Sequence, residues 1–148
     1  MFVFRIKRKR LIILLTAVLL VVTAIIIFVN TDLTPVVDYA EANSKSYSLK
    51  ATNKNDRIGF FEKLGIKVTD EAVDEVTIPQ QFNSVYESYN ELQKKCGLNL
   101  SRYAGKTATR YTYGTDDGKK AVILVFKNRI IGGHITSGVY GEDYLPLF

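Results

Sequence analysis

The sequence predicts an α+β domain, with two helices packed on an antiparallel sheet of about four or five strands, preceded by one transmembrane helix. Three observations predict this class. A long uncharged apolar run lies near the N-terminus. Two later segments repeat apolar residues at helical spacing. Several short segments rich in β-branched and aromatic residues alternate with turn residues.

The apolar run Leu11–Val29 contains no charge and is interrupted only by Thr16 and Thr23. As a helix rising 1.5 Å per residue it spans about 28 Å, close to the hydrocarbon thickness of a bilayer. Each threonine hydroxyl can bond to a carbonyl of its own helix, so neither residue prevents insertion. The run is longer than the apolar core of most secretory signals and lacks an Ala-x-Ala pattern. A retained anchor is therefore favoured over a cleaved signal peptide.

The basic character of the chain is confined to its first ten residues. The net charge of the 148-residue chain is +5, and beyond position 10 the 15 Lys and Arg balance the 15 Asp and Glu. A nucleic-acid-binding domain normally carries excess positive charge on its folded part, so no nucleic-acid partner is expected. The positive flank predicts a cytoplasmic N-terminus (1–10), a membrane helix (11–29) and an extracytoplasmic C-terminal domain at the cell membrane.

Residues 30–51 are expected to form a tether, because they are polar and lack a clear period. The domain itself is expected to occupy 52–148. Its first helix begins after Thr52 or Asn53, either of which can cap it, and ends before Gly65.

Two short strands are expected next, at 66–69 and 73–78, with the acidic residues around them forming a solvated edge. The clearest later helix lies in "QFNSVYESYNELQKKCG" and ends at Gly97. Steps of three and four residues predict its apolar face to carry Phe82, Val85, Tyr86, Tyr89, Leu92, Gln93 and Cys96.

Three strands are predicted in the C-terminal third, at 106–113, 121–126 and 129–136. The middle one, "AVILVF", is continuously apolar and is therefore placed centrally, with both of its faces covered. Asn128 tolerates the positive φ that a tight hairpin turn requires. The tail 137–148 has no clear period and receives no predicted element.

Few residues in the chain fit catalysis or metal binding. His134 is the one histidine and Cys96 the one cysteine, which is too few for a zinc site, so no metal and no cofactor is expected. Cys96 is interpreted as a buried small hydrophobe and His134 as a sheet or surface residue. A cysteine nucleophile would need His134 close to Cys96 in space, and a carboxylate pair is the other possible catalytic group.

Five tyrosines and one arginine form the group that best fits a binding face. Tyrosine rings with polar tips often build a core with a wet rim, and this interpretation is favoured. Tyrosine and arginine are also common at binding surfaces, which is the alternative. The residues concerned are Tyr86, Tyr89, Tyr103, Arg110, Tyr111 and Tyr113.

Several ordered blocks resemble one known family. They are "RIGFFEKLGIKV", "VTIPQQFNSVYESYNELQKKCGLNLSRYAGKTATRYTY" and "LVFKNRIIGGHI", which together cover about Arg57 to Ile135. These blocks resemble the domain of unknown function numbered 4830, found in Gram-positive, clostridia-type bacteria, often behind one N-terminal membrane segment. The chain departs from the family pattern at Lys127-Asn128, where family members tend to have Asp-Gly, and in its tail. The resemblance implies no activity, ligand or catalytic residue.

The predicted function is a membrane-anchored, extracytoplasmic and non-catalytic module that binds a protein, a peptide or an envelope component. The alternative is a small hydrolase-like envelope enzyme that uses Cys96 and His134 or a carboxylate pair.

Overall fold

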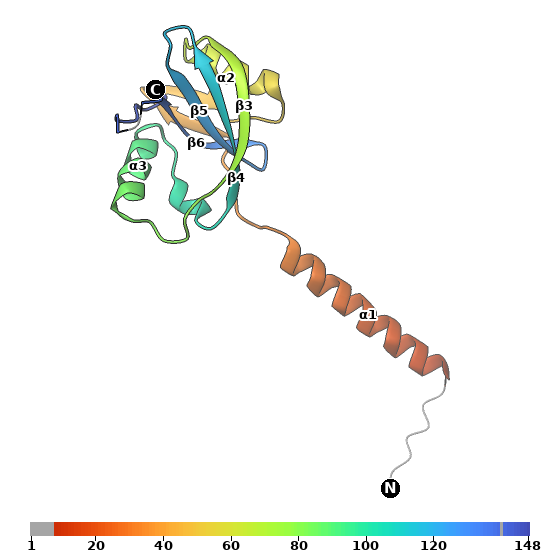
Figure 1. The fold of residues 1–148 in the computed structure, drawn as a ribbon. Coiled ribbons are helices and arrows are strands. Elements are labelled where there is room, and N and C mark those ends of the chain that lie inside the picture. The colour runs from red at the N-terminus through yellow and green to blue at the C-terminus, as the bar shows by residue number, and fades with distance from the viewer. Residues whose placement is uncertain (1–7, 140) are drawn as a thin grey trace. The chain divides into compact units, whose positions relative to one another are not determined.

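The computed structural model describes residues 8–139 and 141–148 of the chain (Figure 1). The chain divides into two compact units, Met1–Thr34 and Pro35–Phe148, and each unit is described by itself.

The first unit contains helix α1, Arg8–Asn30. Within it the hydroxyls of Thr16 and Thr23 donate to the carbonyls of Ile13 and Leu20, each at 2.9 Å, as predicted for threonines bonded within their own helix. The stretch Ile12–Val29 is long and apolar enough to cross a membrane, and none of it is buried against other parts of the protein. A signal sequence near the N-terminus can also be long and apolar enough to meet these criteria, so α1 is a candidate span.

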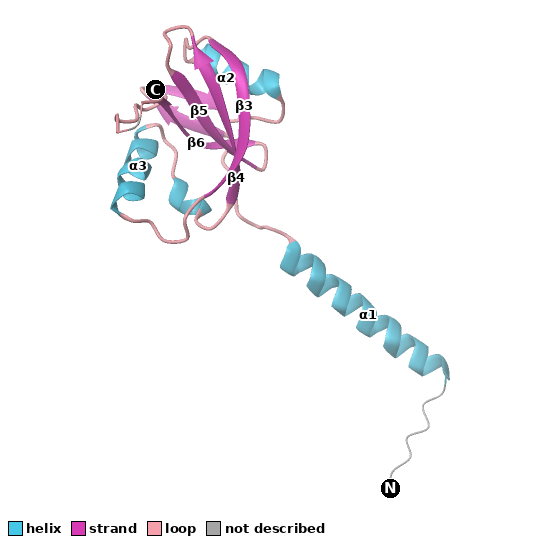
Figure 2. Ribbon diagram, in the orientation of Figure 1, coloured by secondary structure: helices cyan, strands magenta, loops and turns pink. Residues whose placement is uncertain are grey.

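The second unit is an α+β domain, as predicted. Its main sheet is antiparallel, with the order β3-β4-β5-β6 (Figure 2). Strand β5 lies between two neighbours and residues 121–125 are buried, which confirms the central position predicted for "AVILVF". The four strands are β3 (Val68–Thr77), β4 (Thr107–Thr115), β5 (Lys120–Phe126) and β6 (Arg129–Thr136).

A two-stranded hairpin occupies much of the segment that was expected to be a tether. Strands β1 (Tyr39–Ala42) and β2 (Lys45–Ser48) pair in antiparallel register. Asn43 and Ser44 both have positive φ, as a two-residue hairpin turn of the twisted kind requires. The tether expectation is wrong for 39–51, because small and apolar side chains here reach the domain core: Ala40, Leu49 and Ala51 are buried. Strands of four residues are too short to show a period in the sequence.

Both predicted helices are present, as α2 (Lys54–Lys63) and α3 (Ser84–Lys95), and a short 3-10 helix η1 (Leu100–Tyr103) follows. The side chain of Asn53 caps α2 by accepting from the Asp56 amide at 2.9 Å. The glycines that follow the two helices, Gly65 and Gly97, have φ of +76° and +68°.

Two local expectations are corrected. The strands expected at 66–69 and 73–78 form one strand, β3, in which a bulge shifts the register between Thr69 and Ala72. Val85, expected on the apolar face of α3, is 74% exposed, because it lies in the first turn beyond the packed part of the helix. Asn90 is buried in α3 instead, where its side-chain oxygen accepts from the Leu100 amide at 2.7 Å.

The two faces of the sheet carry separate hydrophobic clusters. The α2 face is defined by the cross-strand row Val73–Tyr111–Ile123 and packs against Phe60 and Phe61 of α2. The α3 face is defined by the row Asp74–Arg110–Leu124 and packs against η1 and the aromatic side chains of α3.

Candidate functional site

The sheet divides the six side chains of the predicted binding face into two groups. Tyr111 and Tyr113 belong to the core cluster on the α2 face, where Tyr113 is fully buried and stacks edge-on against Phe61. Successive residues of a strand point to opposite faces, so Arg110 belongs to the α3 face. Three tyrosines pack in the cluster on that same face, and the group there is Tyr86, Tyr89, Tyr103 and Arg110.

On the α2 face, the tyrosines take part in a buried polar network. Arg57 of α2 donates from Nη2 to Oε1 of Glu71 at 2.9 Å and from Nε to the hydroxyl of Tyr113 at 2.9 Å. The Tyr113 hydroxyl donates in turn to Glu71. The Arg57 guanidinium also lies 3.8 Å from the centre of the Tyr111 ring. The network attaches α2 to the bulge in β3, which is a structural role.

The charge state of this network follows from its contacts. Burial raises the pKa of Glu71, but the hydrogen bonds from Tyr113 and Arg57 outweigh burial and the pKa lies below its usual range. Burial and the bond to Glu71 raise the pKa of Tyr113 to about 12. The network is therefore an ionised carboxylate held by a guanidinium and a neutral phenol.

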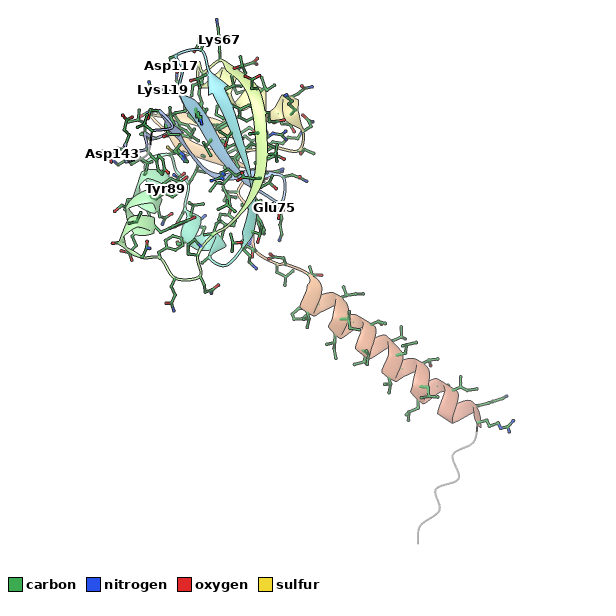
Figure 3. The ribbon with its side chains drawn as sticks, viewed as in Figure 1. Lys67, Glu75, Tyr89, Asp117, Lys119 and Asp143 are labelled. Atoms are coloured by element: carbon green, nitrogen blue, oxygen red, sulfur yellow. The ribbon has the colours of Figure 1, made fainter. Side chains whose placement is uncertain are left out.

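On the α3 face, His134 of β6 is the centre of an aromatic group. Its Nδ1 lies 2.8 Å from the hydroxyl of Tyr89, and its ring stacks on Tyr144 with 4.1 Å between centroids. The rings of Tyr89 and Tyr144 pack edge to face at 5.6 Å. Figure 3 shows Tyr89 on α3, close to the C-terminal segment that carries Asp143. No pattern in the sequence joins His134 to this group, and Tyr144 lies in a tail without a period, so sequence reasoning missed both contacts.

Burial and, as the smaller cause, the positive charge of Arg110 together lower the pKa of His134 to about 4. Burial also raises the pKa of Tyr89, so its phenol keeps its proton. At neutral pH the pair is therefore an uncharged imidazole hydrogen-bonded to an uncharged phenol. Such a pair holds the two rings in fixed positions.

An exposed ion pair borders these rings. Arg110 of β4 donates from Nε to Oδ1 of Asp74 in β3 at 2.8 Å. A second hydrogen bond runs from Nη2 of Arg110 to Oδ2 of Asp74. The two side chains are 44% and 50% exposed. We call the whole set the aromatic surface, and it comprises Tyr86, Tyr89, His134, Tyr144, Arg110 and Asp74.

Cys96 and His134, the two residues considered as a catalytic pair, form hydrogen bonds with different residues. Cys96 is buried, and its thiol lies 3.5 Å from the carbonyl oxygen of Phe148. His134 contacts Tyr89 and Tyr144 instead. Within residues 8–139 and 141–148, no hydrogen bond joins Cys96 to His134, so the described part of the chain lacks the bonded thiol–imidazole pair that a cysteine nucleophile uses.

A shallow surface hollow of about 720 Å³ lies between α3 and η1. Its wall is mostly polar, with Phe82 as its one aromatic residue, and neither Cys96 nor His134 lines it. In the described part of the chain no group of three or more His, Cys, Asp or Glu side chains is placed to hold a metal ion.

These features define an α+β domain with a partly exposed aromatic surface. The chain belongs to the family described as Domain of unknown function (DUF4830), whose profile matches residues 60–135, just over half of the chain. This match confirms the family predicted from the sequence blocks. Searches of curated proteins and of solved structures found no match.

Proposed function

We propose that the protein is a single-pass membrane protein whose α+β domain lies outside the cytoplasm and binds a protein, a peptide or an envelope component without catalysis. The observation that carries the binding role is the aromatic surface, in which a buried His134–Tyr89 pair supports the half-exposed ring of Tyr144 beside Arg110.

The residue types of this surface are those that contribute most to binding energy at protein interfaces. Tyrosine and arginine are enriched at interaction hot spots, since a tyrosine ring buries a large area and still offers a polar tip. Tyr144 is 49% exposed, yet its ring is held by stacking on His134 and by Tyr89. Rings that are already fixed lose little conformational entropy when a partner binds.

The anchor is supported by α1 and by the residues before it. The apolar side chains of α1 are exposed, and a bilayer would cover them. Positive residues precede the helix and favour a cytoplasmic N-terminus. Attachment would also raise the concentration of the domain at the membrane surface.

Photo-crosslinking in native membranes tests the binding role. A photoreactive phenylalanine analogue replaces Tyr144 on the aromatic surface or, as the matched control, Tyr39, which is 65% exposed on the hairpin. The expected result is a discrete adduct from position 144, weakened by Arg110→Ala and missing from position 39. Identical adducts from both positions, or none from position 144, would contradict the proposed binding face.

Cysteine labelling in intact cells tests the orientation. Cys96 is buried and cannot report, so the reporter is Lys119→Cys in the exposed turn between β4 and β5 (Figure 3). A membrane-impermeant maleimide is expected to label it without permeabilisation. Labelling only after permeabilisation would place the domain in the cytoplasm, and a mature mass lacking α1 would show a cleaved signal instead.

A further inference from the structure

The outer edge of β6 is covered along its length by other parts of the chain. At one end the Ile130 amide donates to the Leu49 carbonyl at 2.8 Å. In the middle the Gly133 amide donates to the side chain of Gln93 at 2.7 Å. At the other end Ile135 and Leu145 exchange two backbone bonds of 2.9 Å. This edge has no room for another strand.

The opposite edge of the sheet is β3, and it is not covered in this way. Strand β3 pairs with β4 on one side and runs along the margin of the sheet (Figure 2). In the part of the chain that the structure describes, no backbone hydrogen bond joins 68–77 to any segment other than β4. An edge strand of this kind presents a row of N–H and C=O groups on which another strand can pair.

The usable part of this edge is Ala72–Thr77. The bulge between Thr69 and Ala72, with φ of +44° at Asp70, interrupts the regular backbone before it. From Ala72 onward the pairing with β4 is continuous to Thr77. Six extended residues span about 20 Å, which is enough for one short strand of a partner.

The side chains of β3 indicate what such a partner carries. Val73 is 55% exposed and offers an apolar contact, and Glu75 is exposed two residues further along on the same face (Figure 3). The strand contains four acidic residues and no basic one. Glu71 and Asp74 already pair with Arg57 and Arg110.

The charges of β3 distinguish between two possible partner strands, a second copy of β3 and a cationic segment of another protein. A second copy of β3 would bring acidic side chains beside acidic side chains, which destabilises a strand pair. A segment with a lysine or arginine beside Glu75 and an apolar residue beside Val73 would gain a favourable cross-strand pair of each kind.

We infer that β3 binds an extended cationic segment of a partner protein, which adds a fifth strand to the sheet along Ala72–Thr77. The inference rests on the proposed binding role and names a second surface for it, separate from the rings of Tyr89, His134 and Tyr144.

The test uses the full-length chain in non-ionic detergent micelles and an acetylated, amidated heptapeptide of alternating lysine and valine. Two control peptides accompany it: one replaces each lysine by glutamate, and the other keeps the lysines but carries N-methyl groups on two adjacent central residues. Fluorescence anisotropy measures affinity, and hydrogen exchange locates the amides that become protected.

Binding of the lysine peptide is expected, with new protection in 72–77. Glu75→Lys should weaken it about fivefold, because one cross-strand ion pair becomes a repulsion, and should permit the glutamate peptide to bind. Glu62→Lys on the exposed side of α2 is the matched charge change and should leave the affinity unchanged.

Equal binding of the N-methylated peptide would show attraction by charge alone and would overturn strand addition. Protection outside β3, or no binding of the lysine peptide, would also overturn it. Each of these three results would leave the proposed function standing if the adduct from position 144 is found, so the two proposals fail separately.

Discussion

Two arginine–carboxylate pairs join β3 to its surroundings, one on each face of the sheet, and their environments differ. Arg57 and Glu71 on the α2 face have side chains that are 8% and 16% exposed. Arg110 and Asp74 on the α3 face are about half exposed. The first pair is completed by the Tyr113 hydroxyl and the Tyr111 ring.

The two pairs therefore contribute differently to stability and to binding. A buried pair fixes the structure, since removing one partner leaves an uncompensated charge away from water. An exposed pair contributes little to stability because water and salt screen it, and both of its side chains stay available to a partner. The ion pair on the α2 face therefore stabilises the domain, whereas the ion pair on the α3 face is displayed to solvent.

The largest effect is expected from Glu71→Ala. This change leaves the Arg57 guanidinium buried without its carboxylate and should lower the free energy of unfolding by about 3 kcal/mol. The value is at the low end for a broken buried ion pair, because the Glu71 side chain is partly exposed. Urea unfolding of the full-length chain in micelles measures it. Near-ultraviolet circular dichroism is the signal, because the chain has 9 tyrosines and no tryptophan.

Asp74→Ala is the matched control on the other face. It removes a carboxylate of equal charge from the same strand, and no measurable change in stability is expected. Equal losses for the two alanine variants would show that the faces do not differ as described.

The second effect is a dependence of stability on pH that arises on the α3 face. His134 is buried as a neutral imidazole with a pKa near 4, whereas in the unfolded chain it takes up a proton near pH 6.5. Because the unfolded state binds the proton first, stability falls as the pH drops through this window, by about 2 kcal/mol between pH 7.5 and 5.

His134→Asn should flatten this loss, and urea unfolding at several pH values measures it. The chain has one histidine, so no other imidazole titrates in the window. A loss that persists unchanged in the variant would assign the effect to other groups.

The sequence predicted the parts of the fold that depend on local pattern. The continuous run "AVILVF", the positive φ of Asn128 and the end of α3 before Gly97 are local signals that the structure confirms. Of the two caps predicted for α2, Thr52 and Asn53, the structure selects Asn53. The hairpin at 39–48 was missed because its strands are short and are stabilised by contacts with a core assembled elsewhere.

The candidate site was predicted only in part. The spacing of α3 placed Tyr86 and Tyr89 on one face, as the structure shows. Side chains alternate along β4, so Arg110 and Tyr111 lie on opposite faces, and the face that each one takes depends on where the helices pack. The contact of His134 with Tyr89 joins residues 45 positions apart, which no local pattern encodes.

The third prediction compares two phenols. Tyr113→Phe removes a hydroxyl that accepts from Arg57 and donates to Glu71, and should lower the free energy of unfolding by about 1 kcal/mol. Tyr144→Phe on the partly exposed ring should leave it unchanged, since stacking on His134 needs no hydroxyl. The same urea titration measures both variants, and a larger loss for Tyr144→Phe would reverse the structural assignment of the two faces.

The smallest effect tests whether Arg110 and Asp74 act on the aromatic surface as separate charges. Arg110 lowers the pKa of His134, so Arg110→Ala should raise that pKa. Asp74→Ala should lower it further, because the guanidinium then acts on the imidazole without its neighbouring counter-charge. An NMR titration of His134 measures its pKa in both variants. Glu62→Gln on α2 is the control and should leave the pKa of His134 unchanged. Opposite shifts are the signature of an ion pair that is electrostatically connected to His134 although it contributes little to folding. Shifts of the same sign would separate the pair from the aromatic surface and confine the binding face to the rings.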